Sequence, residues 1–152
     1  MADATKIQPL NRDEEAFLRA LGRVMALLPR LVDADMLEEH SISSTEYTVL
    51  FQLSEVPHNQ MRMSELANVC GLSLSGMTRV VNRLESQSLV IRQKAPDDGR
   101  ALLAVLTSAG WTLLKQSWPT NLASVRRHIF SRLEGCDIAA AAEVLQRIAP
   151  DS

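Results

Sequence analysis

The sequence lacks the features that mark secreted, membrane-spanning and metal-binding proteins. Its two cysteines, Cys70 and Cys136, and its three histidines are scattered, so neither a disulfide framework nor a zinc site has the spacing it requires. The longest apolar run, residues 101–106, is far shorter than the about 18 residues that span a membrane. The N-terminal residues are polar and lack the apolar core of a signal peptide. We therefore expect a cytoplasmic protein that holds no metal or cofactor and has no membrane partner.

Aromatic residues and catalytic motifs are also scarce. Aromatic side chains make up 4% of the 152 residues, whereas apolar residues make up 46%, which favours a folded helical protein over a β-sandwich or a disordered chain. Gly71, Gly76 and Gly99 stand alone, so the sequence has no glycine-rich phosphate loop. No nucleophile is spaced with a base, and no pair of carboxylates stands out. The chain therefore fits one small domain, mainly helical, that is not an enzyme.

Charge is distributed unevenly along the chain, although the net charge is only −2. Residues 1–60 carry 5 Lys/Arg against 10 Asp/Glu, residues 61–106 carry 6 against 4, and residues 107–152 carry 5 against 4. The middle third is thus mildly basic and follows a clearly acidic stretch. Two explanations stay open: a chance distribution of solvated charge, or a surface for an anionic partner.

The N-terminal part predicts a tail followed by a long amphipathic helix. Residues 1–11 have the composition of a loose tail, and Asn11 is placed to cap a helix over residues 12–37. Pro29 removes a backbone donor and is expected to kink this helix. Apolar residues form two adjacent stripes, which together are wider than the face that one neighbouring helix covers. The stripes consist of Phe17, Leu21, Val24, Leu28 and Leu31, and of Leu18, Met25 and Val32.

Capping residues mark three further helices. Ser43 and Glu46 form a capping box at the start of a helix over residues 44–55. Ser64 is expected to cap a short helix, and Ser73 opens the next helix after a tight turn that contains glycine. Two short helices joined in this way form a helix-turn-helix, and the second of them presents small and basic side chains.

A β-hairpin follows directly after these two helices. Residues 89–94 and 101–106 have the pattern of strands, and residues 95–100 form a polar, charged tip between them. This order is that of a winged helix-turn-helix. It suits DNA, because a helix fits the major groove, arginine bonds guanine edges, and a narrow minor groove attracts arginine at the wing. Residues 43–107 are therefore predicted to be a DNA-binding domain.

The remainder of the chain predicts two more helices. Thr107 caps a long helix that runs to about residue 132, and Gly135 separates it from a last helix. Together, residues 12–37 and 108–149 carry more apolar surface than one subunit can bury, which predicts that they form the dimerisation region of an obligate homodimer. The inward face of the last helix is expected to consist of Ile138, Ala141, Leu145 and Ile148.

The segment from Leu66 to Gly110 resembles the core of the multiple-antibiotic-resistance regulator (MarR) family. Its most specific part is the wing, where Asp98-Gly99-Arg100 is followed by an apolar strand and by the run from Leu106 to Gly110, LTSAG. The resemblance implies a homodimer whose first and last two helices interlock. It also implies a transcriptional regulator, usually a repressor, that binds a double-stranded DNA operator and is often released by a small aromatic or phenolic effector.

The expected DNA contacts lie at two helix N-termini, on the second helix of the helix-turn-helix and on the wing. The helix N-termini at Ser64 and Ser73 can hold phosphates. The resemblance implies that Arg100 enters the minor groove, that Asp98 orients it, and that Ser75, Thr78, Arg79 and Arg83 are groove and phosphate contacts. The full predicted set is Ser64, Ser73, Ser75, Thr78, Arg79, Asn82, Arg83, Arg92, Lys94, Asp98 and Arg100.

Two positions depart from the family pattern. The family usually has arginine at the positions of Leu74 and Gly99, so the base preference is open, and Leu74 either packs or touches a thymine methyl group. These departures and the mild charge of the middle segment leave a second function open. In that alternative, the chain is a winged-helix protein-interaction module that has lost DNA binding.

The resemblance also implies an effector cleft between the dimerisation helices and the DNA-binding domain. Tyr47 is the first candidate to line it, because a phenol ring can stack on an aromatic ligand while its hydroxyl remains available for a hydrogen bond. Each candidate is otherwise a plain core residue. The full set is Met25, His40, Tyr47, Phe51 and Trp111.

Overall fold

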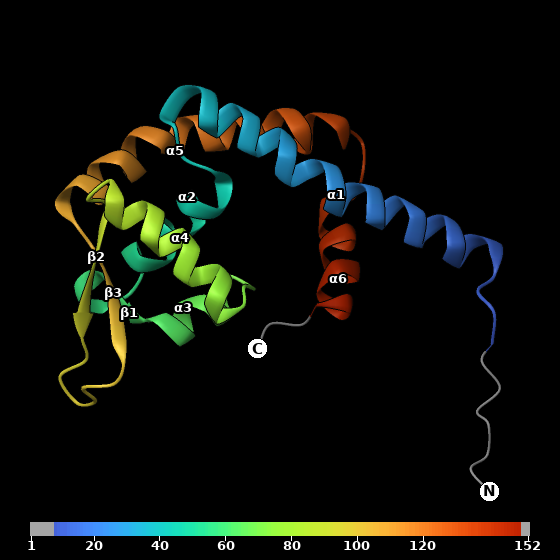
Figure 1. Ribbon diagram of the computed structural model, residues 1–152. Coiled ribbons are helices and arrows are strands. Elements are labelled where there is room, and N and C mark those ends of the chain that lie inside the picture. Colours follow the sequence, from blue (N-terminus) through green and yellow to red (C-terminus); the bar gives the residue numbers. More distant parts are fainter. Residues whose placement is uncertain (1–7, 150–152) are drawn as a thin grey trace, which may run out of the picture.

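The computed structural model describes residues 8–149, and its elements follow the predicted order (Figure 1). Of the predicted loose tail, residues 1–7 lie outside the described part, and residues 8–11 precede the first helix without regular structure. Two long helices lie side by side, and three short helices form a lobe with a small sheet at one end of this pair. The helices are α1 (Arg12–His40), α2 (Ser44–Ser54), α3 (Met63–Val69), α4 (Leu74–Ser86), α5 (Ser108–His128) and α6 (Ile138–Ile148).

The sheet has three antiparallel strands in the order β1-β3-β2. The hairpin of β2 (Val90–Lys94) and β3 (Leu102–Leu106) confirms the predicted wing, although each strand begins one residue later than expected. Strand β1 (Gln60–Arg62) was not predicted. It follows a 3₁₀ turn, η1 (Pro57–Asn59), and is too short to show the alternation by which strands are recognised. Its pairing with β3 fixes the wing to the helix-turn-helix.

Local capping chemistry sets most helix starts, as the sequence predicted. The Asn11 side chain accepts hydrogen bonds from the backbone N–H groups of Asp13 and Glu14, and the Glu14 carboxylate accepts one from the Asn11 N–H. Ser43 and Glu46 make the same reciprocal pair at α2. These side chains satisfy backbone N–H groups that have no partner within the helix.

Two helix ends differ from the sequence prediction. Helix α1 continues to His40 rather than ending at residue 37, because Ser41 adopts a left-handed conformation (φ 58°) and its N–H closes the last turn on Leu37 O at 3.1 Å. A serine at this position gives no sequence signal, since glycine is the usual residue there. Helix α5 stops at His128 and is followed by a 3₁₀ turn, η2 (Phe130–Arg132). Pro29 does not break α1.

The core of the lobe is built from the inner faces of α2, α3 and α4 and from the sheet. Gly110 in α5 shows how closely these parts approach, because a Cβ atom there would press into the carbonyl oxygen of Leu89 and lie 2.6 Å from Leu106 Cδ1. Only glycine allows the start of α5 to lie against the strands. The fully buried side chains of the lobe are Val49, Leu50, Leu53, Leu66, Met77, Val81, Leu84 and Val90.

A polar cluster joins the C-terminal half of α1 to α5. The carboxylate of Asp35 accepts a hydrogen bond from Ser124 Oγ at 2.6 Å and lies 3.0 Å from His128 Nε2 and 3.5 Å from Arg127 Nη1. The Ser124 hydrogen bond above all, assisted by His128 and by the charge of Arg127, outweighs desolvation and lowers the pKa of Asp35. The carboxylate is therefore stabilised in its charged form at the helix–helix contact.

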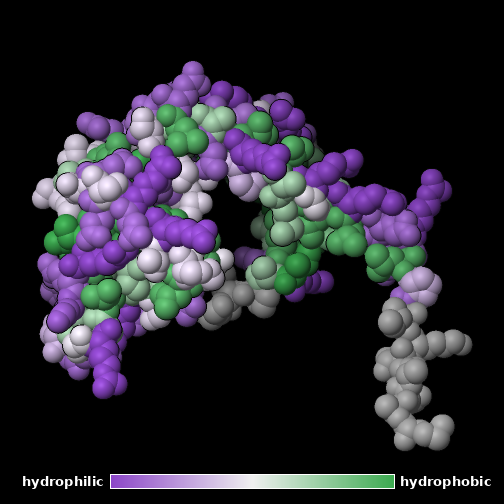
Figure 2. Space-filling view, viewed as in Figure 1, coloured by the Kyte–Doolittle hydropathy of each residue, from purple (hydrophilic) through white to green (hydrophobic). Residues whose placement is uncertain are grey.

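The helical arms, which we define as residues 12–31 of α1 together with α6, present apolar side chains to the surface. Figure 2 shows this as green surface over α6 and along the projecting end of α1. No residue of α6 is buried in the single chain, so the face that was predicted to point inward is open. Within residues 8–149, no helix is long and apolar enough to cross a membrane. The large exposed apolar residues of the arms include Phe17, Leu18, Val24, Met25, Leu27, Leu31, Ile138, Val144, Leu145 and Ile148.

Candidate nucleic-acid interface

The turn between α3 and α4 fixes the position of the second helix of the helix-turn-helix. Gly71 has φ +64°, a conformation that residues with a side chain rarely adopt. Ser73 then caps α4, with its Oγ accepting from the Gly76 N–H at 3.1 Å. A Cβ atom on residue 76 would lie 3.2 Å from this Oγ, so glycine leaves room for the cap. The prediction that Ser73 opens α4 is confirmed.

The prediction that Ser64 caps α3 is wrong. Helix α3 begins at Met63, and Arg62 precedes it in an extended conformation without a side-chain cap. Ser64 therefore lies inside the first helical turn. The sequence signal was misleading because serine is a favoured capping residue, but Ser64 stands one position after the helix start. Strand β1 instead determines where the chain turns into α3.

The outer face of α4 carries the small and basic residues that the sequence indicated. Met77, Val81 and Leu84 are buried, which turns the opposite side of the helix to the surface. The hydroxyl of Thr78 donates to Leu74 O at 2.8 Å. The Ser75 hydroxyl lies 3.1 Å from that of Ser73. The exposed residues of this face are Leu74, Ser75, Thr78, Arg79, Asn82 and Arg83.

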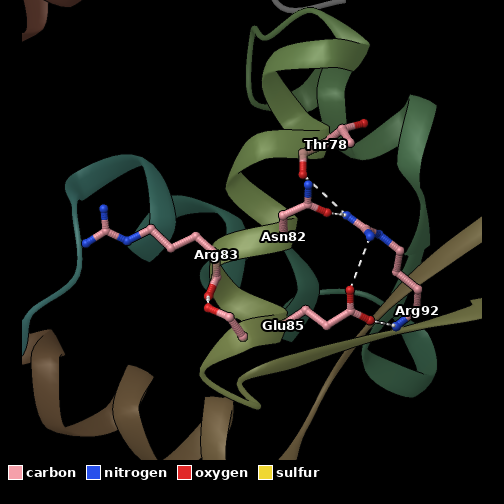
Figure 3. Close-up of polar contacts among 6 residues, drawn as sticks. Thr78, Asn82, Arg83, Glu85 and Arg92 are labelled. Atoms are coloured by element: carbon pink, nitrogen blue, oxygen red, sulfur yellow. Dashed lines mark hydrogen bonds and ion pairs between the residues drawn. The ribbon is translucent and has the colours of Figure 1, made fainter.

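Arg92 of β2 is bound to α4 instead of projecting from the wing (Figure 3). Its Nη1 donates to Glu85 Oε2 at 3.1 Å, and its backbone N–H donates to Glu85 Oε1 at 3.2 Å. Its Nη2 contacts the Asn82 side-chain oxygen and donates to the Thr78 carbonyl at 3.3 Å. Two residues that were predicted as DNA contacts, Arg92 and Asn82, thus bind each other. This network, which we call the Arg92 clamp, joins the wing to α4.

Arg83 points away from the Arg92 clamp, toward α2 (Figure 3). Its Nε lies 2.9 Å from Glu46 Oε1, although the two groups are not aligned as a hydrogen bond. The Glu46 side chain is only 3% exposed, and its other oxygen accepts from the Ser43 N–H at 2.7 Å. A buried carboxylate without a partner is costly, so Arg83 has an intramolecular role besides any contact with DNA.

The wing tip is held by a residue that sequence reasoning missed. Arg62 Nη2 lies 2.6 Å from Asp97 Oδ2, and its Nη1 lies 3.7 Å from Asp98 Oδ2. Asp98 also accepts from the backbone N–H of Arg100 at 3.0 Å. Its carboxylate therefore orders the backbone of Arg100. Arg62 is 35 residues from Asp97 in sequence, and only the pairing of β1 with β3 brings the two together.

These pairings divide the basic residues of the lobe into two groups. Arg62, Arg83 and Arg92 are engaged within the chain, whereas Arg79, Lys94 and Arg100 form no ion pair with any described residue. Between α4 and the wing lies an open groove of about 340 Å³. The Ser64 side of α3 also faces it. The groove is lined by Arg62, Met63, Ser64, Leu74, Thr78, Arg92, Arg100, Ala101 and Leu102.

A second hollow, of about 240 Å³, lies between the end of α2 and α5. Phe51 stacks on Trp118 with ring centroids 6.5 Å apart, and Lys115 Nζ lies 5.1 Å from the centre of the Trp111 ring. Of the predicted effector residues, Phe51 and Trp111 line this hollow. Its remaining lining residues are Ser54, Glu55, Leu114, Lys115 and Trp118.

The other three predicted effector residues do not line this hollow, and their place in an effector cleft stays a prediction. Met25 is 69% exposed on the projecting arm of α1. His40 Nε2 lies 2.8 Å from the Thr120 hydroxyl. Tyr47 is buried, burial raises the pKa of its phenol, and its hydroxyl has no hydrogen-bond partner in the described part of the chain. Burial likewise raises the pKa of the Cys70 thiol, which keeps it protonated.

Comparison with known proteins identifies relatives that share this architecture. The crystal structure of AbsC, a MarR family transcriptional regulator from Streptomyces coelicolor, superposes with a TM-score of 0.84 at 32% sequence identity, over 94% of this chain and 96% of that one. This chain belongs to the MarR family. The family model itself matches residues 40–101, and relatives with this fold are transcriptional regulators rather than enzymes.

Two further MarR-type relatives extend the comparison. Sco3205, a MarR family transcriptional regulator from Streptomyces coelicolor crystallised in complex with DNA, superposes with a TM-score of 0.89 at 27% identity, over 95% of this chain and 91% of that one. The transcriptional regulator MhqR from Bacillus subtilis is 28% identical over 112 residues, which are 74% of this chain and 75% of MhqR. The likeness therefore includes the long helices outside the family-model match.

For this MarR-family chain, sequence reasoning located the basic residues of α4 and the wing better than the residues that pair with them. It placed α4, the wing and the basic residues on them. It did not find that Glu46 and Glu85 pair with Arg83 and Arg92, or that Arg62 pairs with the acidic residues of the wing tip. The only sequence signal for Arg62 was its charge at the edge of the basic segment.

Proposed function

We propose that this protein is a cytoplasmic transcriptional repressor that binds a pseudo-palindromic DNA operator as a homodimer. The observation that carries this proposal is the pair of cations on α4 and on the wing. Arg100 lines the groove between these elements, Arg79 is exposed on α4, and neither forms an ion pair with a described residue. One free cation on a helix and another on a wing suit a protein whose helix enters a major groove and whose wing contacts the neighbouring minor groove.

The homodimer follows from the helical arms. We assign dimerisation to residues 12–37 and 108–149, as the sequence suggested, and DNA binding to residues 43–107. The apolar side chains of the arms are exposed in the single chain, and a second copy would bury them. A two-fold axis between two copies would repeat the α4 helix, so that the operator half-sites lie about 10 base pairs apart.

The charges favour DNA over the alternative of a protein-interaction module. Arg79, Lys94 and Arg100 are the candidates for direct contact with DNA, together with the hydroxyls of Ser75 and Thr78. Arg92 and Asn82 support them through the Arg92 clamp. Arg100 lines the groove without an ion pair to a described residue, and its charge suits a phosphate backbone.

DNA binding is tested by selecting sequences from a random duplex library and measuring affinity against salt. We expect a pseudo-palindrome and a strong salt dependence. Arg79→Ala should weaken binding by about 1–3 kcal/mol if it reads a base. Thr112→Ala, an exposed change on α5 away from the groove, serves as the control. A wild-type protein that selects no sequence would support the protein-interaction module instead.

We also propose that a small aromatic acid or phenol controls DNA binding from the hollow at α2 and α5. The support is the aromatic lining by Phe51, Trp111 and Trp118, with Lys115 as the cation for a carboxylate. A ligand releases DNA only if it prefers the conformation in which the recognition helices are wrongly spaced. Coupling of about 1–3 kcal/mol would weaken operator binding 5- to 150-fold.

Calorimetric titration of a panel of aromatic acids, with and without operator, tests this control. Reciprocity requires operator DNA to weaken ligand binding by the same factor. Trp111→Ala should abolish ligand binding while it leaves operator affinity in place. Equal ligand affinity in both states would remove the claim of control, and repression itself is tested by a reporter gene placed behind the selected operator.

A further inference from the structure

We propose that Leu74 recognises the 5-methyl group of a thymine in the operator. The proposal rests on the DNA binding proposed above and goes beyond it, because it assigns the base preference of one position. It concerns an exposed apolar residue that lines the groove between α4 and the wing together with three arginines and Leu102.

Leu74 lies at the start of the second helix of the helix-turn-helix. It is the first residue of α4, directly after the Ser73 cap, and its side chain is 56% exposed. In helix-turn-helix proteins the N-terminal residues of the recognition helix contact base edges. An exposed leucine at this point is therefore directed at bases rather than at phosphates.

The neighbours of Leu74 in the first turn of α4 determine which base edge this turn suits. Ser75 and Thr78 are the polar neighbours of Leu74, and the Thr78 hydroxyl already donates its hydrogen to Leu74 O. No arginine or lysine lies in this turn to bond a guanine edge. Among the four bases, only thymine presents an apolar group, its 5-methyl, in the major groove. Contact between this methyl group and Leu74 would remove apolar surface from water on both sides.

The charged residues of the groove argue against an apolar protein segment as its occupant. Arg100 lines the groove without an ion pair among the described residues, and Arg62 and Arg92 lie beside it. Carboxylates already pair with Arg62 and Arg92, so Arg100 is the cation of the groove that attracts a polyanion. Leu74 is thus an exposed apolar side chain in a groove that Arg100 also lines, an arrangement that suits a methyl group on a nucleic acid.

The competing explanation is that Leu74 only packs against the wing. Leu102 of β3 is 43% exposed and lines the same groove, so it provides a matched control. If Leu74 only packs, its truncation lowers affinity for every DNA sequence alike. If Leu74 reads thymine, the effect of truncation depends on one methyl group.

The experiment replaces each thymine of the selected operator in turn by uracil, which removes only the methyl group. Affinities are measured for the wild type, Leu74→Ala, Leu74→Met and Leu102→Ala. For one thymine in each half-site, we expect uracil to weaken wild-type binding about fourfold, the equivalent of about 0.8 kcal/mol for a buried carbon group. Leu74→Ala should lose this sensitivity, whereas Leu74→Met and Leu102→Ala should keep it.

The outcomes separate the two levels of the proposal. Equal sensitivity to uracil in the wild type and in Leu74→Ala would overturn the reading of thymine, while operator binding itself stands. A wild-type protein that binds no selected duplex would overturn the proposed function as well. Because Leu74 is exposed, thermal melting of Leu74→Ala should match that of the wild type, which confirms that the variant is folded.

Discussion

The winged-helix lobe and the helical arms differ in where their apolar residues find partners. In α2, the side chains of Val49, Leu50 and Leu53 are completely buried by the same chain. On the arms, Met25 is 69% exposed and Leu145 is 54% exposed, although both regions have the periodic apolar pattern of an amphipathic helix. The lobe closes its core within one chain, whereas the arms leave theirs open.

An amphipathic pattern specifies that one face of a helix is buried. It does not specify whether the same chain or a second copy covers that face. Burying one leucine side chain contributes about 1.5–3 kcal/mol, and the arms expose many such side chains. A monomer would not gain this free energy and would expose a large apolar surface to water. Four predictions test how far the two regions differ.

The largest effect is expected from a charge on the open face of α6. Leu145→Asp should prevent association, because each of the two copies loses about 1.5–3 kcal/mol of apolar burial and gains a desolvated carboxylate. We expect the dimer dissociation constant to rise at least about 100-fold and operator binding to be lost with it. Sedimentation equilibrium at several concentrations measures this.

The matched control for this variant is Gln146→Asp, which introduces the same charge on the polar side of α6. It should leave the dimer intact. If Leu145→Asp remains a dimer with unchanged affinity, the arms are not the interface, and the contrast between arms and lobe would need another explanation.

The second prediction concerns the closed packing of the lobe. Gly110→Ala forces a methyl group into the Leu89 carbonyl and Leu106, so α5 must shift away from the strands. We expect a loss of about 3 kcal/mol in the free energy of unfolding, measured by urea denaturation. Gly22→Ala on the arm meets nothing within 4 Å in the single chain and adds helix propensity. Stability that falls equally in both variants would contradict the distinction.

The third prediction tests the Arg92 clamp inside the lobe. Arg92→Gln and Glu85→Gln should each weaken operator binding by about 1 kcal/mol, because the wing loses its fixed position relative to α4. The double variant should be no weaker than either single variant, since both changes break one interaction. The salt dependence of binding should stay unchanged in all three.

A direct phosphate contact by Arg92 would give a different result. In that case Arg92→Gln alone would reduce the slope of affinity against salt by about one unit, and Glu85→Gln would not weaken binding. Filter binding over a range of salt concentrations distinguishes the two roles.

The smallest effect is expected at the polar cluster between the C-terminal parts of α1 and α5. The pKa of Asp35 is lowered below its usual 3.8 in the folded state, so its charged form stabilises the fold. This stabilisation is complete above that pH and is lost as pH falls through the lower native value. The wild type should therefore exceed Asp35→Asn in stability at pH 5–7, and the difference should shrink below about pH 4.

Denaturant unfolding across this pH range measures the Asp35 contribution. Glu38→Gln provides the control, because Glu38 is exposed on the same helix and makes no hydrogen bond or ion pair with a described residue. A difference between wild type and Asp35→Asn that does not change with pH would show that the charge of Asp35 is irrelevant to the α1–α5 contact.

The sequence by itself determined the elements that depend on neighbouring residues. Caps at Asn11, Ser43, Ser73 and Thr107 act over two or three residues, and helical periodicity acts over a few turns, so both can be read without a fold. The order of the helix-turn-helix and hairpin followed from them. The one cap that failed, Ser64, failed where the preceding strand β1, held by its pairing with the distant strand β3, sets the helix start.

The tertiary structure alone decided which basic side chains are left without an ion pair among the described residues. Arg62 pairs with Asp97 over 35 residues, Arg83 with Glu46 over 37, and Asp35 with His128 over 93. Such pairs form because packing brings distant segments together, and no local spacing marks them. Sequence analysis could therefore locate the basic face of α4 and the wing. Only the fold separated the cations that hold the lobe together from those that are free to meet DNA.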